Sequence, residues 1–156
     1  MNNSLKFHWL VLAGILGGLT EVIWISLYSF SMGTPIAPIA NAITATVYPA
    51  ANVLPLAPVF GLVIHMILSI LLALGFGYFI WPLVARLFHS TQTALIASIT
   101  TLALVWKINF FVLLPTWNPE FISLLPLATT LISKLLFGVT MGFVLTMQQQ
   151  KSVLPH

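Results

Sequence analysis

Formal charge is almost absent from this chain. Five lysine or arginine residues and two acidic residues are spread over 156 positions, and 60% of the residues are hydrophobic. In a typical soluble domain about 25% of the residues are charged, and a water-facing surface of this size cannot be covered with so few. The composition therefore predicts that lipid, rather than water, surrounds most of the chain.

Four apolar segments are long enough to cross a bilayer as helices. The hydrocarbon core is ~30 Å thick, and about 20 helical residues span it. The segments cover residues 9–30, 58–81, 92–114 and 126–147, and none has a periodic polar face. We predict an all-α integral membrane protein with four transmembrane helices, a four-helix bundle that forms a single transmembrane domain over residues 1–156.

The first apolar segment has one alternative interpretation. Lys6 followed by an apolar run fits the beginning of a cleaved signal peptide. However, the run is longer than such a region, contains Glu21 and has no small-residue cleavage pattern near its end. We therefore expect a retained helix.

Positive charges outside the spans predict the orientation. Lys6, Arg86 and Lys151 fall on one side of a four-span chain, whereas the other side carries Glu120 and no basic residue. Cytoplasmic loops of membrane proteins are enriched in lysine and arginine. The pattern predicts that both termini are cytoplasmic, and we expect a bacterial inner (cytoplasmic) membrane location.

The longer connection on the outer side, residues 31–57, has no charge and is rich in proline. Within it an apolar stripe recurs at helical spacing, at Ile36, Ile39, Ala40, Ile43 and Val47. This spacing favours a short interfacial or re-entrant helix that is too short to span. The alternative is an ordered apolar loop packed on the helix ends.

The shorter outer connection follows Leu114 and contains a helix-start pattern. Asn118 is suited to the N-cap, Pro119 to the first helical position and Glu120 to the first turn. Pro126 then either kinks this helix or begins the fourth span after a short turn.

Small residues form stripes on three of the predicted spans. Such residues let helix backbones approach closely in lipid. We expect helix-packing contacts at Gly14, Gly18, Gly61, Ser69, Gly138 and Gly142. The glycine pairs of the first and fourth spans share a face with Glu21 and Lys134, respectively, so we expect both side chains to lie between helices.

Four ionisable residues fall inside the spans: Glu21, His65, Lys107 and Lys134. A charge at the bilayer centre costs at least ~2.5 kcal/mol, so each needs a partner or a path to water. At ~1.5 Å per residue, all four lie roughly 10–13 Å from the outer ends of their helices. We predict an intramembrane polar cluster in which Glu21 pairs with Lys134, with Asn109 as a further neighbour.

Each member of the cluster also has a simpler interpretation. The Glu21–Lys134 pair could serve only to fix the helix register. Lys107 could extend to the outer head groups, and His65 could be a hydrogen-bonded packing residue. One acid against two lysines leaves a positive charge, which an anion from lipid, solution or a partner subunit could balance.

The sequence indicates no metal site, no catalytic residue and no particular cofactor. The chain has no cysteine, and His8, His89 and His156 fall at or beyond the cytoplasmic boundary without the spacing of a metal pair. The basic residues are scattered singly, which argues against a nucleic-acid partner.

Three functions are compatible with these features. The leading hypothesis is an accessory or assembly subunit of a larger membrane complex, which would contact lipid and either other subunits or further copies of itself. The alternative is a small oligomeric carrier or channel that handles protons or anions at the polar cluster. The third is a binder of lipid, quinone or haem. Independent catalytic activity is the least expected.

Overall fold

The computed structural model describes residues 5–88, 90 and 92–153, and within these ranges it contains helices and no strand. Four helical segments are long and apolar enough to cross a membrane, as the sequence predicts. They are α1 (Phe7–Ser31), α3–α4 (Ala57–Leu87), α5–α6 (Thr93–Trp117) and α8 (Leu127–Val153). Two short helices connect them at one end, α2 (Ala37–Val47) and α7 (Pro119–Ser123).

The second and third segments run further than the sequence predicts, past Pro82 and Pro115. Proline normally breaks a helix because it lacks an N–H group and its ring clashes with the carbonyl four residues earlier. Both prolines follow a π-helical turn, η2 (Phe76–Ile80) and η3 (Asn109–Leu113). The α-helical hydrogen-bond ladder is already interrupted at these wider turns, so the chain resumes as α4 (Trp81–Leu87) and α6 (Leu114–Trp117).

Gly33 ends α1 with a glycine-dependent turn. Its φ of 65° lies in the left-handed region, which glycine adopts without a steric penalty. The N–H of Gly33 donates to the carbonyl of Phe30 at 3.1 Å, and the N–H of Thr34 donates to that of Ser29 at 2.9 Å. This is a Schellman motif, and it turns the chain from α1 towards α2.

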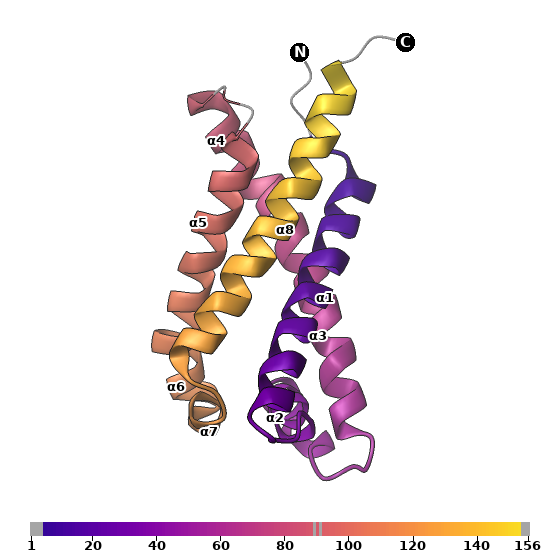
Figure 1. Cartoon of the computed structure of the whole chain (residues 1–156), viewed down its shortest axis with the longest axis vertical. Helices are drawn as coiled ribbons and strands as arrows, with labels where there is room; N and C mark the ends of the chain where they lie inside the picture. The colour runs from indigo at the N-terminus through magenta and orange to yellow at the C-terminus, as the bar shows by residue number, and fades with distance from the viewer. Residues whose placement is uncertain (1–4, 89, 91, 154–156) are drawn as a thin grey trace.

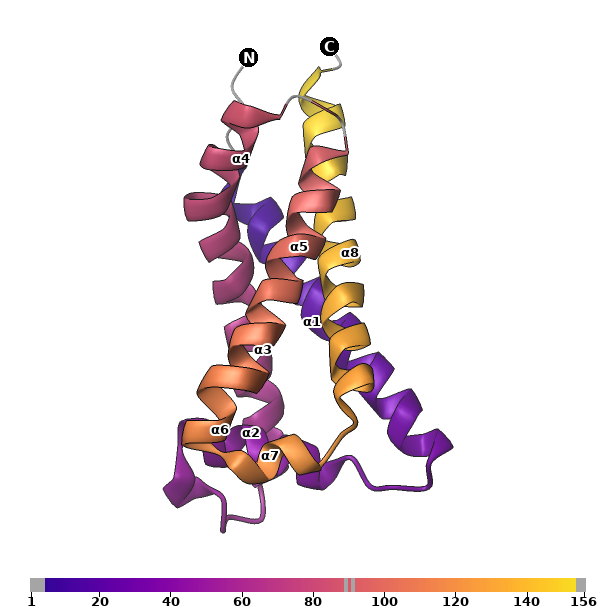
Figure 2. The ribbon, with the colours of Figure 1, turned by 90° about the vertical axis from the view of Figure 1, so that its left-hand side faces the viewer.

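The long helices are arranged as two pairs that diverge at one end. At the centre α1 packs against α8, while α3 packs on the other side of α1 and α5 on the other side of α8. Figure 1 shows that the α3–α4 helix crosses behind and meets α5 at the end that carries both termini. At the opposite end the two pairs separate, and α2 and α7 lie there in contact with each other (Figure 2).

The glycine stripes pack each pair together and do not face each other. A side chain at Gly14 would meet the backbone of Ile70 on α3, and one at Gly142 would meet the backbone of Leu95 on α5. Gly18 and Gly138 pack in the same two directions. The glycines of the first and fourth spans therefore do not pack against each other, because each central helix uses its glycines to contact its outer partner.

The contact between α1 and α8 depends on a different glycine, Gly17. The ring of Phe137 on α8 occupies the space that a Gly17 side chain would need. Towards the termini the helices pack around an apolar core. Its largest fully buried side chains are Leu10, Phe76, Leu102, Phe137, Met141 and Leu145.

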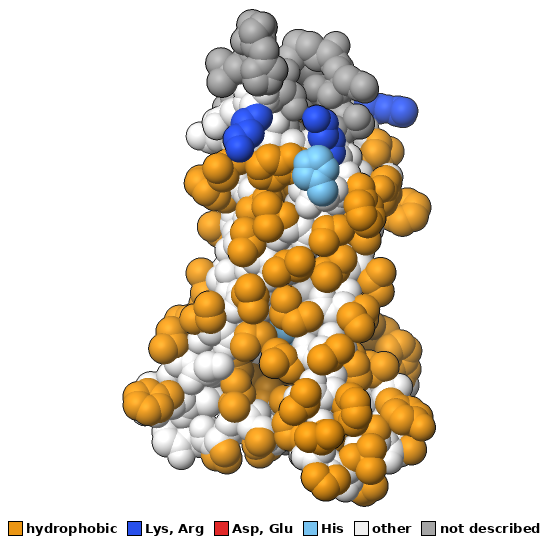
Figure 3. Space-filling view, turned by 90° about the vertical axis from the view of Figure 1, so that its right-hand side faces the viewer, with side chains coloured by type: hydrophobic (Ala, Val, Ile, Leu, Met, Phe, Trp, Pro, Cys, Tyr) orange, Lys and Arg blue, Asp and Glu red, His pale blue; other side chains and the backbone are white. Residues whose placement is uncertain are grey.

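The surface is apolar over most of its height. Figure 3 shows hydrophobic side chains over the visible face, with Lys and Arg side chains gathered at the end that carries the termini. Many large apolar side chains of the described residues are exposed, such as Phe30 at 86% and Phe79 at 75%. Soluble monomers rarely expose large contiguous apolar patches, so four apolar helices with this surface suggest a membrane-embedded protein.

Candidate functional site

Glu21 is the buried centre of a polar cluster at the wide end of the molecule. Its side chain lies on α1 and is 4% exposed. The Lys134 Nζ donates to Glu21 Oε2 at 2.8 Å, and the Ser133 Oγ donates to Glu21 Oε1 at 3.0 Å. Two consecutive residues of α8 therefore contact the two carboxylate oxygens, and the Ser133 hydroxyl, which has one hydrogen, also lies 3.0 Å from the carbonyl oxygen of Thr130.

His65 on α3 joins this cluster from the other side of α1. Its Nε2 lies 3.3 Å from the carbonyl oxygen of Gly18 and 3.8 Å from Glu21 Oε2. The approach is possible because α1 and α3 are close at this level, where Gly18 packs directly on Ser69. Side chains from α1, α3 and α8 thus converge on one carboxylate.

Lys107 is not part of the cluster. It is exposed on α5, and neither Lys107 nor Asn109 lines the pocket that the other three residues share. The order of the helices explains this difference, because α8 lies between α5 and α1. Within the cluster Glu21 and Lys134 compensate each other. The unbalanced positive charge of the spans is therefore that of Lys107, which lies outside the cluster.

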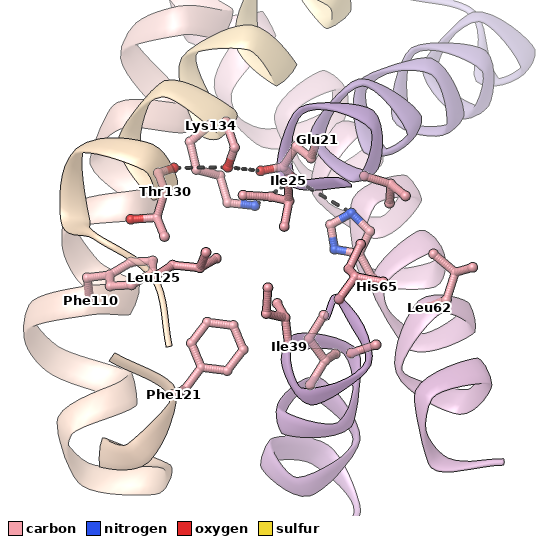
Figure 4. A pocket seen from close by; sticks show the side chains of 15 residues that line it. Glu21, Ile25, Ile39, Leu62, His65, Phe110, Phe121, Leu125, Thr130 and Lys134 are labelled. Atoms are coloured by element: carbon pink, nitrogen blue, oxygen red, sulfur yellow. Dashed lines mark hydrogen bonds and ion pairs between the residues drawn. The ribbon is translucent and has the colours of Figure 1, made fainter. Parts of the chain in front are cut away.

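A pocket with a volume of about 140 Å³ opens next to Glu21, His65 and Lys134. Its walls come from both helix pairs and from the two short helices. Apolar side chains form most of these walls, among them Ile25, Ile39, Leu62, Phe110 and Phe121. In Figure 4 the three ionisable side chains lie at one end of the open space and the rings of Phe110 and Phe121 lie across it from His65.

The helix α2 forms one wall of this pocket with the apolar stripe that the sequence predicts. Ile36, Ile39, Ala40 and Ile43 of the stripe line the cavity, so much of it faces inward. Close packing holds α2 in place, because Gly61 leaves room for the backbone of Ala40 against α3. The buried Thr44 Oγ1 also donates to the carbonyl of Ala57 at 2.6 Å.

Asn118 ties α2 to the opposite helix pair. It occupies the N-cap position of α7, as predicted, but its side chain does not cap that helix. Instead, Asn118 Nδ2 donates to the carbonyl of Ala42 at 3.1 Å and to Thr46 Oγ1 at 2.9 Å. Sequence spacing cannot reveal this contact, because α2 is more than 70 residues away along the chain.

Two tryptophans brace the first turns of α8 beside the pocket. Trp24 Nε1 donates to the carbonyl of Thr129 at 3.1 Å, and Trp106 Nε1 donates to Thr130 Oγ1 at 3.0 Å. Pro126 lies just before α8 (Leu127–Val153), so it begins this helix and does not kink α7. These contacts fix the turn of α8 that presents Ser133 and Lys134 to Glu21.

The arrangement combines a satisfied carboxylate with two nitrogens that remain available to a ligand. Glu21 accepts one hydrogen bond from Lys134, whose ammonium group has three hydrogens to donate. The second ring nitrogen of His65 faces the open space in Figure 4. Among the described residues no three His, Asp or Glu side chains come together as metal ligands would. His8 is exposed, and His89 and His156 lie outside the described residues.

These features suit a small polar group attached to an apolar body. The end of the pocket at Lys134 can donate hydrogen bonds to the ligand, and the remaining walls of the pocket offer apolar contact. No protein-family model, curated protein or solved structure matches this chain, so its function must be inferred from the residues of the pocket.

Proposed function

We propose that this protein spans a bilayer with its four long helices and binds an amphiphile in the pocket at its wide end. The observation that carries the proposal is an apolar cavity that ends at Glu21, His65 and Lys134. Buried charges inside a membrane are costly, and they commonly mark binding sites or pathways. Ligand sites typically combine apolar walls with a few polar groups that orient the ligand.

The size of the cavity limits the class of ligand. About 140 Å³ is close to the roughly 150 Å³ of an engineered cavity that admits benzene. It can hold one ring, or a head group and its first few carbons. A porphyrin is several rings across, and His65 is the one histidine among the described residues that line the pocket, which include no Met or Cys to serve as a second axial ligand. A lipid- or quinone-type amphiphile is therefore the better candidate. The rest of such a ligand would lie outside the cavity.

Filling the cavity is expected to weaken ligand binding by more than tenfold. In Ile39→Trp the indole would occupy the space between the two helix pairs, and excluding even two methylene groups costs a ligand about 1.6 kcal/mol, or more than tenfold in affinity. The measurement is native mass spectrometry of the purified protein titrated with decanoic acid and with a short-chain benzoquinone. Val47→Trp is the matched control, because Val47 is an exposed residue of the same helix and does not line the cavity. Equal retention of both probes by the two variants would contradict the proposal.

The proposed orientation places both termini on the cytoplasmic side of a bacterial inner membrane. It is supported by Lys6, Arg86 and Lys151 near one end and Glu120 near the other. The chain has no cysteine, so single cysteines can report on each side. We expect a membrane-impermeant maleimide to label Asn52→Cys in intact spheroplasts and Ser90→Cys only after permeabilisation. The reverse labelling pattern would show that both termini lie on the opposite side of the membrane.

The accessory-subunit hypothesis stays a prediction, and it is compatible with ligand binding. It expects other subunits at fixed stoichiometry in particles extracted with mild detergent, and a particle containing this chain alone would count against it. The carrier or channel hypothesis requires a polar route beyond the pocket. Towards the termini, however, the described core is built around Leu10, Phe76 and Phe137, so this conformation favours binding over conduction.

A further inference from the structure

We propose that the ligand is a weak acid, a carboxylic acid with an apolar chain, and that it binds together with one proton. This inference rests on the proposed function and specifies the chemistry of the head group. It is carried by the hydrogen-bonding state of Glu21 and His65 and by the charge balance of the pocket.

Glu21 is not available to the ligand. Its oxygens already accept from Ser133 and Lys134, and its side chain is 4% exposed. The Lys134 and His65 side chains are each 18% exposed. The head group therefore meets Lys134 and His65, whose Nζ and Nε2 atoms lie 2.8 Å and 3.8 Å from the same Glu21 oxygen.

The neighbours of His65 determine which ring nitrogen carries the hydrogen. Nε2 lies near two acceptors, the carbonyl oxygen of Gly18 and Oε2 of Glu21, so we assign the hydrogen of the neutral ring to Nε2. Nδ1 then carries a lone pair and faces the cavity (Figure 4). The site offers the ligand a donor at Lys134 and an acceptor at His65.

A carboxylic acid matches this pair of groups. Its carbonyl oxygen can accept from Lys134 Nζ, and its O–H can donate to His65 Nδ1. If the proton moves from the acid to Nδ1, the same complex contains a carboxylate and an imidazolium. The total charge is the same in both forms.

Charge balance favours binding with a proton over binding of the bare anion. Of the described residues that line the pocket, three are ionisable, and Glu21 and Lys134 already compensate each other. A carboxylate alone would add an uncompensated charge to a cavity with largely apolar walls, which is unfavourable. A proton taken up from solution removes that charge. An ester or ketone adds no charge, but it has no hydrogen to donate to His65.

The test is calorimetric titration of the full chain in detergent with decanoic acid, methyl decanoate and decyl phosphate. At about pH 9 a free carboxyl group is ionised, so two buffers with different ionisation enthalpies report the number of protons taken up. We expect about one proton per bound decanoic acid, and binding of the methyl ester at least about tenfold weaker, because it lacks one hydrogen bond. His65→Gln should weaken binding of the acid by at least a similar factor and reduce the proton uptake.

The outcomes separate this inference from the proposed function. Decanoic acid that binds without proton uptake, or an ester or phosphate that binds as tightly as the acid, overturns the weak-acid inference and leaves amphiphile binding intact. Unchanged affinity and proton uptake in His65→Gln also overturn it. If none of the three probes binds, or if Ile39→Trp binds them as well as Val47→Trp does, the proposed function fails together with the inference.

Discussion

Lys134→Met is expected to destabilise the folded protein by about 3–5 kcal/mol, the usual loss when one partner of a buried ion pair is removed. The carboxylate of Glu21 would keep its hydrogen bond from Ser133 but lose the cation 2.8 Å away. Because only 3% of the residue is exposed, water cannot fully replace the lost cation. The measurement is the free energy of unfolding in mixed detergent and SDS, followed by tryptophan fluorescence.

Lys107→Met is the matched control for this substitution. Lys107 lies in another long helix but is exposed, and no ion pair joins it to any described residue, so its replacement should change the stability by less than about 0.5 kcal/mol. The double variant Glu21→Gln/Lys134→Met should recover most of the loss, because replacing both partners leaves no unpaired charge. Equal effects of the two single lysine variants would show that the Glu21–Lys134 pair contributes little.

Gly61→Ala is expected to cost about 1–3 kcal/mol and to disturb the pocket, because overpacking a close contact forces the backbone to shift. A methyl group at this position would overlap the carbonyl oxygen of Ala40 on α2. The backbone of α2 cannot move aside as a side chain could, so the helix that forms one pocket wall must be displaced. Unfolding free energy and binding of decanoic acid should both decrease.

Gly75→Ala on the same helix separates packing from helix propensity. Apart from its chain neighbours and the backbone of its own helix, no atom of the described residues lies within 4 Å of the position that a Gly75 side chain would take. Alanine stabilises a helix relative to glycine by about 1 kcal/mol, so this variant should be as stable as the original protein or more stable. If Gly61→Ala were equally harmless, the close contact between α2 and α3 would not be needed to hold the pocket wall.

Together, the Lys134→Met and Gly61→Ala experiments test which interactions hold the walls of the pocket in place around Glu21. The ion pair joins α1 to α8, while the Gly61 contact holds α2 against α3. The first interaction is electrostatic and the second is steric, so they act on different sides of the cavity. A loss of ligand binding without a loss of stability in either variant would point to a local change in the pocket.

The sequence alone determined the helical class and the number of long helices. Apolar runs longer than a bilayer span, with almost no charge, leave few alternatives, since backbone groups in lipid must be satisfied within a helix or a closed barrel. The same local reasoning predicted the helix at Ala37–Val47 from its apolar spacing. It could not show that the apolar stripe lines a pocket, because that depends on which helices lie nearby.

Local patterns also placed two helix ends too early. The predicted spans end before Pro82 and Pro115, but π-helical turns precede both prolines and the helices continue past them. Asn118 is a residue type that favours the N-cap position, yet its side chain donates hydrogen bonds to α2. In both cases a competing local or distant interaction outweighed the intrinsic preference of the residue.

The polar cluster shows most directly what only the tertiary structure decided. Charge and depth in the sequence singled out Glu21, His65, Lys107 and Lys134, because ionisable residues are rare in apolar helices. The order of the packed helices then selected three of them, since α8 lies between α5 and α1 and leaves Lys107 outside. Ser133 and the walls of the cavity became recognisable only after packing, because a pocket is formed by residues distant in sequence whose contacts depend on how the helices cross.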